Sequence, residues 1–251
     1  MSCIELYFMG TGASTHPKRY QSSLAILYNG RAYVIDYGCT AHNMLFKMGL
    51  DPSDVDAYIF THAHYDHLCG FPQTLFSGSF RDYIEYRVVA DPRTWAVLRR
   101  MLSTIMISGG LYKPSITWMA SPPLEDYKLA DDIALTMKRA RHAIESYYIM
   151  IEAGGHRIVI SGDTAPLPEL EALASSASVT IHEATLPDSV DEEVEYFTGH
   201  TRASTAAYIA SKSRVGLLYH ISPSSEEDAI AAAEKYANVS VPDDGSRYRI
   251  C

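Results

Sequence analysis

Three histidines and one aspartate lie within six consecutive positions of this sequence. They belong to the run Thr61-His62-Ala63-His64-Tyr65-Asp66-His67, which follows an apolar segment at residues 56–60. Residues two apart in an extended chain point to the same side, so His62 and His64 can bind one metal ion together. Asp66 and His67 follow in a predicted turn and would face another direction, which suits a second ion beside the first. The spacing therefore predicts a dinuclear metal centre.

Four side chains do not complete two metal sites, because a catalytic divalent ion takes about three protein ligands and keeps one position open. The candidates for the missing ligands are His142, Asp163 and His220. Each of them lies at a predicted strand end or in the loop that follows one. A shared metal site at one edge of the fold requires this placement.

Apolar segments between turn signals predict the elements that would carry these residues. Strands are expected at 3–9, 24–28, 31–35, 56–60 and 87–90, with Asn29-Gly30 as the turn of a hairpin. Helical patterns are found at 41–48, 92–107, 167–177, 203–213 and 226–238. Before the last helix, Ser224 and Glu227 have the spacing of an N-terminal capping box.

The second half of the chain repeats the order of the first. Strands at 147–152 and 157–161 flank Gly154-Gly155 and lead to Asp163, as the first hairpin leads to Asp36. A helix and a strand that runs into a histidine follow in both halves. The repetition predicts a single domain, residues 1–251, whose two pseudo-repeated halves each supply a sheet. The strand ends would meet at one edge, where α/β proteins place their chemistry.

The composition is that of an acidic globular chain. Lys and Arg number 21 and Asp and Glu 30 among 251 residues, which gives a formal charge of −9. This balance argues against a protein whose main work is holding nucleic acid by charge. Apolar runs fall short of the about 18 residues that suggest a membrane span, and the N-terminus does not have the pattern of a signal peptide. The four cysteines contain no CxxC pair and are expected to be reduced, so we expect a cytoplasmic protein without a membrane partner.

The run His62-x-His64-x-Asp66-His67 resembles the signature of the metallo-β-lactamase superfamily. Other segments narrow the resemblance to its ribonuclease Z-like branch, and they span nearly the whole chain in the order of that family. These segments are Gly10-Thr11-Gly12-Ala13, Ser161-Gly162-Asp163-Thr164, His182-Glu183-Ala184-Thr185, Gly199-His200-Thr201 and His220-Ile221-Ser222. The resemblance implies an α/β fold, namely the four-layer αββα sandwich of two mixed sheets with outer helices, and a metal-dependent hydrolase.

The resemblance also implies a role for each candidate residue. One metal ion would be bound by His62, His64 and His142, the other by Asp66, His67 and His220, and Asp163 would bridge the two. His200 would be a catalytic or phosphate-contacting histidine that Glu183 orients. Imidazole ligands with a shared carboxylate favour Zn²⁺, and Mn²⁺ and Fe²⁺ are the alternatives.

Such a centre hydrolyses esters by attack of metal-bound hydroxide, because two divalent ions lower the pKa of a shared water to about 7. Asp66 is the expected acceptor of the proton of that water. His200 is the expected proton donor to the leaving alkoxide. The segment Gly10, Thr11 and Gly12 is predicted to let the backbone approach the substrate.

Ribonuclease Z enzymes usually carry a long arm that grips tRNA between the third-ligand histidine and the bridging aspartate. Here residues 143–162 separate these positions, and a predicted hairpin uses most of them. The expected enzyme is therefore an armless phosphodiesterase that acts on a small or cyclic phosphodiester or on an RNA end. The alternatives are a tRNA 3′-processing endonuclease, an arylsulfatase- or lactonase-like hydrolase, and a metal-binding protein without activity. Members of the branch are often dimers, so the resemblance also implies a homodimer.

Overall fold

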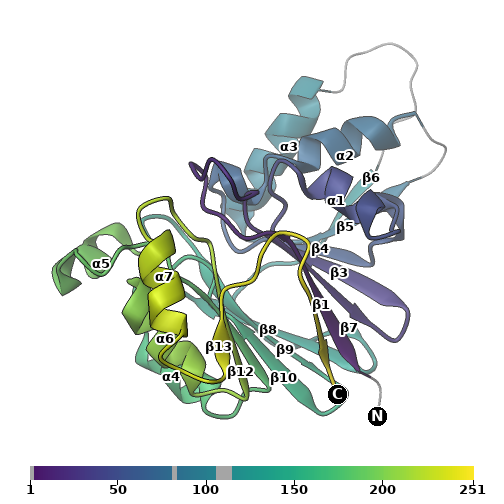
Figure 1. Ribbon diagram of the computed structural model, residues 1–251. Coiled ribbons are helices and arrows are strands. Elements are labelled where there is room, and N and C mark those ends of the chain that lie inside the picture. Colours follow the sequence, from purple (N-terminus) through teal and green to yellow (C-terminus); the bar gives the residue numbers. More distant parts are fainter. Residues whose placement is uncertain (1–2, 81–83, 106–114) are drawn as a thin grey trace.

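The computed structural model describes residues 3–80, 84–105 and 115–251, which form two seven-stranded sheets (Figure 1). In spatial order, the first sheet contains β14 (Arg247–Ile250), β1 (Ile4–Gly10), β2 (Ser23–Tyr28), β3 (Arg31–Ile35), β4 (Ala57–Ile59), β5 (Glu85–Val89) and β6 (Ser115–Ala120). The second contains β13 (Val239–Ser240), β12 (Val215–Tyr219), β11 (Val179–Glu183), β10 (His156–Ile160), β9 (Tyr147–Ala153), β8 (Ile133–Arg139) and β7 (Leu124–Ala130).

The two sheets have the same pattern of strand directions. In the first, β14, β1, β2 and β3 pair antiparallel, and β3, β4, β5 and β6 pair parallel. In the second, β7 to β10 pair antiparallel, and β10 to β13 pair parallel. This correspondence supports the predicted pseudo-repeat, and the single domain of two related halves stays a prediction.

Both predicted hairpins form with the expected turn residues. Asn29 and Gly30 have φ values of 49° and 75°, and Gly154 and Gly155 have values of 58° and 80°. Two successive positive φ angles are typical of the type I′ turn, which matches the twist of the flanking strands.

The helices cover the outer faces of the two sheets (Figure 1). The first sheet is covered by α1 (Ala41–Lys47), α2 (Phe71–Gly78) and α3 (Pro92–Ile105), and the second by α4 (Pro168–Ala174), α6 (Ala203–Ser211) and α7 (Glu226–Ala233). α5 (Glu192–Thr198) projects from the rim of the second sheet, and short 3₁₀ turns occur at Pro52–Asp54 and Tyr65–His67.

Three apolar layers hold this arrangement together. Side chains of both sheets, among them Phe8 and Ile149, form the central core between the sheets. Leu45 and Phe71 pack helices against the first sheet, and Leu170 packs α4 against the second. The expected α/β architecture, an αββα sandwich of two mixed sheets with outer helices, is confirmed.

Two expectations about local structure are wrong. The helix predicted at 226–238 ends at Ala233, and Ser225 precedes it without a side-chain cap. The Ser225 hydroxyl instead donates to the carbonyl of Ala184, so tertiary contact replaces the predicted Ser224 capping box. Two short helices, α2 and α5, were not expected.

The expectation of four free thiols is also wrong. The structure pairs Cys3 with Cys251 and Cys39 with Cys69. The first bond joins the antiparallel strands β1 and β14 near their ends. The second links the loops that follow β3 and β4, which neighbour each other because these strands are adjacent and parallel. Within the described residues, no helix is both long and apolar enough to cross a membrane.

Candidate active site

The predicted metal ligands converge on one edge of the sandwich because they follow strand ends that meet there. His62 comes shortly after β4, His142 after β8, Asp163 after β10 and His220 directly after β12. In the second sheet, β8 and β10 both run antiparallel to β9 and therefore end at the same edge. An isolated bridge between His62 and Ser146 connects this edge with the first sheet.

Three histidines form what we call the first ligand group: His62, His64 and His142. The Nδ1 atom of His64 lies 3.0 Å from the Nε2 atom of His62 and 3.0 Å from that of His142. A zinc ion with Zn–N bonds of about 2.0–2.1 Å in tetrahedral geometry needs ligand nitrogens about 3.3 Å apart. The three imidazoles therefore face one point and fit a single ion.

Three further side chains form the second ligand group: Asp66, His67 and His220. The Nε2 atoms of His67 and His220 lie 3.2 Å apart, and that of His220 lies 3.3 Å from Oδ2 of Asp66. The spacing is again that of ligands around one ion. His220 takes up this position with φ of 55°, a conformation that is uncommon for residues other than glycine.

Asp163 lies between the two groups. Its Oδ2 atom is 3.6 Å from Nε2 of His62, 3.4 Å from that of His67 and 3.5 Å from that of His220. Its Oδ1 atom is buried and has no hydrogen-bond partner within the described residues. A buried carboxylate oxygen without a partner is costly, and a bound cation would remove this cost. Asp163 thus lies against both ligand groups, and its bridging of two ions stays a prediction.

The protonation of the histidines fits two ions as well. Burial lowers the pKa of each histidine of the first ligand group, so these rings are neutral, the form that a metal requires. Burial also lowers the pKa of His67, but the carboxylates of Asp163, Asp36 and Asp66 outweigh it and raise this pKa well above its usual range. The carboxylates thus favour a positive charge at this point, whether a proton or a metal ion.

Hydrogen bonds donated by Nδ1 orient four of the candidate ligand histidines so that their Nε2 atoms face the two ligand groups. A metal-binding histidine commonly donates its other ring N–H to an oxygen, and this fixes both tautomer and orientation. The partners are Thr61 Oγ1 for His62, Asp36 Oδ2 for His67, the Gly199 carbonyl for His142 and Thr185 Oγ1 for His220.

Asp36 is a functional residue that the sequence analysis did not assign. Its carboxylate accepts hydrogen bonds from Nδ1 of His67 at 2.7 Å and from the hydroxyl of Thr61 at 2.7 Å. Because Thr61 in turn contacts His62, this one carboxylate is linked to a histidine of each ligand group. Asp36 has φ of 53° and is buried. Its place after the first hairpin, like that of Asp163 after the second, was the signal that could have revealed it.

We expect the substitution Asp36→Asn to weaken metal binding by about 10- to 100-fold, because Asn keeps the shape but loses the charge that orients His67. Competition with a chromophoric chelator measures this affinity. Asp56→Asn is the matched control, since Asp56 also accepts a backbone N–H, at 2.9 Å from Ala32, but lies away from the site. Equal affinities of the two variants would contradict the role of Asp36.

Glu183 organises the opposite side of the centre. This fully buried carboxylate accepts a hydrogen bond from Nδ1 of His200 at 2.9 Å and from the hydroxyl of Thr185 at 2.5 Å. The Thr185 hydroxyl oxygen in turn accepts a hydrogen bond from Nδ1 of His220, which orients that ring. Burial lowers the pKa of His200, but the charge of Glu183 outweighs it and raises that pKa to about 9. His200 is therefore protonated at neutral pH, and its hydrogen bond to Glu183 fixes the orientation of the ring. The catalytic role of the two residues stays a prediction.

The segment 10–13 lies beside the second ligand group. The N–H of Ala13 donates to the carbonyl of Ile221, and that of Ile221 donates to the carbonyl of Thr11. The absence of a side chain at Gly10 is required because a Cβ atom would lie 1.9 Å from the carbonyl oxygen of Gln21. Gly10, Thr11 and Gly12 are all buried, so the structure assigns them packing next to His220. Substrate binding by this segment stays a prediction.

Two of the three basic side chains before His142 form ion pairs with glutamates. Lys138 forms an ion pair with Glu125, and Arg139 forms one with Glu145. The Arg141 guanidinium stacks on the Tyr196 ring of α5, 4.5 Å from its centroid, and has no ion pair within the described residues.

Residues 143–162 are all described and consist mainly of the β9–β10 hairpin, so no tRNA-gripping arm is present there.

A family model described as anti-Pycsar protein Apyc1 matches residues 4–208 of this chain. The ribonuclease Z of Shouchella clausii (strain KSM-K16) is 26% identical over 272 aligned residues, which cover 87% of each protein. Among solved structures, the metallo-β-lactamase fold protein YhfI from Bacillus subtilis superposes with a TM-score of 0.80 and 18% identity over 99% of this chain and all of that one. The short form of human tRNase Z gives a TM-score of 0.75 and 21% identity, with 98% and 99% coverage.

The predicted superfamily and branch are thereby confirmed, together with the enzyme class. The chain has the metallo-β-lactamase fold, and it is a metal-dependent hydrolase of the ribonuclease Z-like branch. Its match to the family model over most of its length places it more closely: the chain belongs to the family of the anti-Pycsar protein Apyc1.

Proposed function

We propose that this protein is a dinuclear phosphodiesterase that hydrolyses small or cyclic phosphodiesters. The observation that carries the proposal is the set of seven candidate ligand side chains, Asp163 and six around it, next to a hairpin where ribonucleases of this branch have an arm. The formal charge of −9 also disfavours a large polyanionic substrate.

Zn²⁺ is the proposed metal, because five imidazoles and two carboxylates suit it, with Mn²⁺ and Fe²⁺ as alternatives. When bound, the ions would supply a water of lowered pKa and positive charge opposite the phosphoryl oxygens. The first and second ligand groups would hold one ion each, and Asp163 would contact both.

Two residues of the chain are placed to move protons. Burial raises the pKa of Asp66, but His67 and His220 outweigh it and lower this pKa, so Asp66 is ionised and can accept a proton from the attacking water. His200 carries a proton on the ring whose other nitrogen is held by Glu183. We propose that this proton goes to the leaving oxygen.

A ribonuclease Z-type tRNA 3′-processing activity is the second candidate, and the 26% identity to a ribonuclease Z is the observation in its favour. The test compares bis(4-nitrophenyl) phosphate, 3′,5′-cyclic nucleotides and precursor tRNA, with metal content measured in parallel. We expect Zn²⁺- or Mn²⁺-dependent turnover of the first two and intact precursor tRNA.

Preferential cleavage of precursor tRNA would instead establish the ribonuclease. Turnover of only 4-nitrophenyl sulfate or a lactone would point to the arylsulfatase- or lactonase-like alternative. No turnover by the fully metal-loaded protein would identify a binding protein.

A homodimer, implied by the family, stays a proposal that sedimentation velocity tests. The cytoplasmic location also stays a prediction, and the two disulfides remove the support that reduced cysteines gave it.

A further inference from the structure

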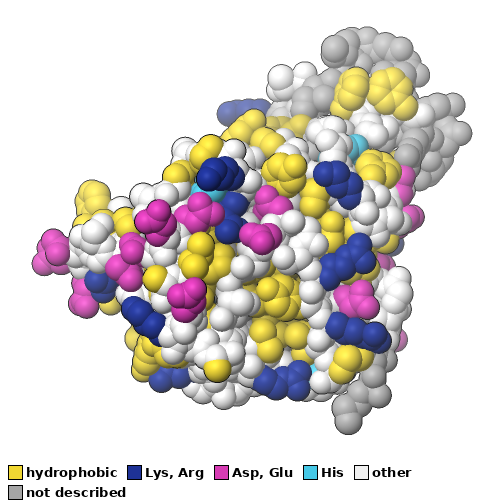
Figure 2. Space-filling view, in the orientation of Figure 1, with side chains coloured by type: hydrophobic (Ala, Val, Ile, Leu, Met, Phe, Trp, Pro, Cys, Tyr) yellow, Lys and Arg dark blue, Asp and Glu magenta, His cyan; other side chains and the backbone are white. Residues whose placement is uncertain are grey.

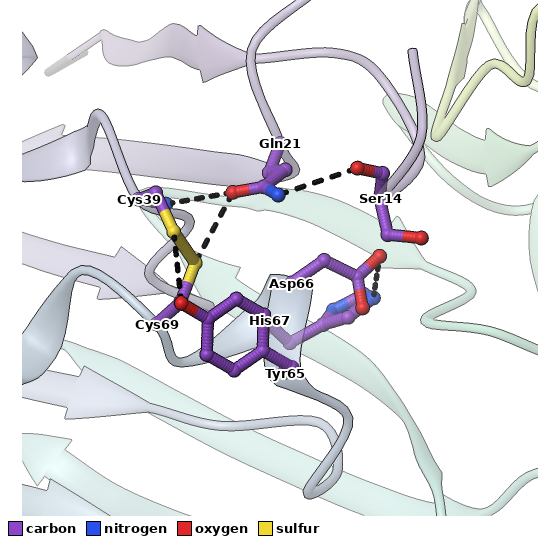
Figure 3. Close-up of a disulfide and its surroundings, with 7 residues drawn as sticks. All are labelled: Ser14, Gln21, Cys39, Tyr65, Asp66, His67 and Cys69. Carbon is purple, nitrogen blue, oxygen red and sulfur yellow. Dashed lines mark hydrogen bonds and ion pairs between the residues drawn. A yellow bond between two sulfur atoms is a disulfide. The ribbon is translucent and has the colours of Figure 1, made fainter.

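One of the two disulfides joins the loops that hold part of the second ligand group. Cys39 lies three residues after Asp36, in the loop that follows β3. Cys69 lies two residues after His67, in the loop that follows β4. Figure 3 shows the bond together with His67 and Asp66. The covalent bond is thus within three residues of a candidate ligand and of the carboxylate that accepts its hydrogen bond.

Hydrogen bonds between the same two loops depend on how closely the loops approach each other. The N–H of Tyr37 donates to the carbonyl of His67 at 2.6 Å, and the N–H of Gly70 donates to the carbonyl of Tyr37 at 3.0 Å. The carboxylate of Asp36 accepts a hydrogen bond from Nδ1 of His67 at 2.7 Å. The disulfide fixes the distance between the loops covalently, and these contacts, including the one that orients His67, require that distance.

The surroundings of the disulfide leave it open to a reagent from solvent. Cys39 and Cys69 are both partly exposed, whereas His67 is fully buried. Oε1 of Gln21 lies 3.1 Å from Sγ of Cys69, and the hydroxyl of Tyr65 lies 3.9 Å from Sγ of Cys39 (Figure 3). These neighbours are polar groups of residues that are themselves partly or largely exposed. Thiol–disulfide exchange requires that a thiolate reaches one of the two sulfur atoms, and this position permits it.

We propose that the Cys39–Cys69 disulfide is a site of thiol–disulfide exchange, and that its reduction weakens metal binding by the second ligand group. The reductant is a dithiol. Its thiolate attacks one sulfur atom, the S–S bond breaks and a mixed disulfide forms. The second thiol of the reagent then displaces the other cysteine. Two electrons and two protons pass to Cys39 and Cys69, which become thiols, and the reagent leaves as its own disulfide.

Reduction acts on the metal through the separation of the two loops. Once the bond is broken, only hydrogen bonds hold the Asp36 carboxylate against His67. Loss of an orienting partner weakens metal binding by about 10- to 100-fold, and the remaining hydrogen bonds place the expected loss near the lower value. The first ligand group should change less, because the carbonyl of Gly199 orients His142. The inference rests on the proposed function and adds its regulation: the centre holds its metal better under oxidising conditions.

The test measures metal affinity before and after reduction of the unaltered protein. Dithiothreitol is the probe because it is uncharged, whereas side chains of both signs are interspersed on the face shown in Figure 2 and would attract or repel a charged thiol. The reagent is removed by gel filtration under argon, free thiols are counted, and Zn²⁺ is titrated against a chromophoric chelator. We expect the weaker of the two Zn²⁺ affinities to fall about tenfold on reduction and to return on reoxidation.

Two double variants assign the effect to one disulfide. Cys39→Ser/Cys69→Ser should have the lowered affinity from the start and should not respond to dithiothreitol. Cys3→Ser/Cys251→Ser is the matched control, since it keeps only the bond between Cys39 and Cys69 and should respond as the unaltered protein does. The bond that it lacks lies at the start of β1, and the length of this strand separates it from Gly10 beside the second ligand group.

Equal Zn²⁺ affinities of the oxidised and reduced unaltered protein would overturn the inference. A higher affinity after reduction would also overturn it, because the freed thiolates would then act as ligands. If Cys39→Ser/Cys69→Ser does not fold, the reduced form of Cys3→Ser/Cys251→Ser gives the same comparison. If the oxidised protein does not bind two ions at all, the proposed function itself fails, so the two failures are distinguishable.

Discussion

Replacement of Asp163 by alanine is expected to release both metal ions and to reduce phosphodiester hydrolysis to background. The carboxylate lies within 3.4–3.6 Å of one histidine nitrogen of the first ligand group and two of the second, so its loss removes a ligand from both ions at once. We expect metal affinity to fall by more than about 100-fold, beyond the effect of losing an orienting partner. Elemental analysis of gel-filtered protein measures the metal content.

The control for this substitution is Asp132→Ala. Asp132 accepts a hydrogen bond from Asn29 at a turn remote from the metal site, and its loss should leave two ions per chain. Because Asp163→Ala also removes a buried charge, Asp163→Asn is a second variant that keeps the shape. Full occupancy of two ions in either Asp163 variant would refute the bridging role.

Replacement of His200 by alanine is expected to keep both metal ions and to slow the chemical step by about 10²- to 10⁴-fold on substrates that release an alkoxide. His200 is held by Glu183 at 2.9 Å, and its ring stacks on His220 with centroids 5.8 Å apart. It is thus next to a candidate ligand, and because both ligand groups are complete without it, we expect the metal ions to stay bound. Hydrolysis of a 3′,5′-cyclic nucleotide measures the loss.

The same variant supplies its own control through the leaving group. 4-Nitrophenolate leaves without protonation, so bis(4-nitrophenyl) phosphate should be hydrolysed by His200→Ala with only a small loss of rate. An equal loss for both substrates would show that His200 acts on phosphate binding or structure rather than as a proton donor. Loss of metal would assign it to the ligands.

Spacing in the sequence was sufficient to predict which candidate ligands cluster at one edge of the fold. The run at 61–67 places its ligands through local geometry alone, and the three distant ligands were predictable because parallel strands end at a common edge. Asp36 was not assigned because its contacts with His67 and Thr61 join the loops after β3 and β4, and its place after the first hairpin was the one signal in the sequence.

The cysteines were misread for a related reason. Local patterns such as CxxC detect neighbours in sequence, whereas Cys39 and Cys69 become neighbours through the pairing of β3 with β4. The extent of α7 was overestimated because helical periodicity continues past Ala233, where the N–H groups of Lys235 and Tyr236 instead form tighter turns with the carbonyls three residues before them. Local signals predicted both hairpins and five of the helices, but the edge strands β6, β7, β13 and β14 and the helices α2 and α5 were not predicted.

The bond between Cys3 and Cys251 has a topological consequence. Its two cysteines are separated by 248 in the sequence, so it closes residues 3–251 into a covalent ring. One cut by a protease in any surface loop would open this ring without separating two fragments. Under non-reducing electrophoresis the cleaved protein should migrate as a single species, and two bands should appear only after a thiol reductant is added.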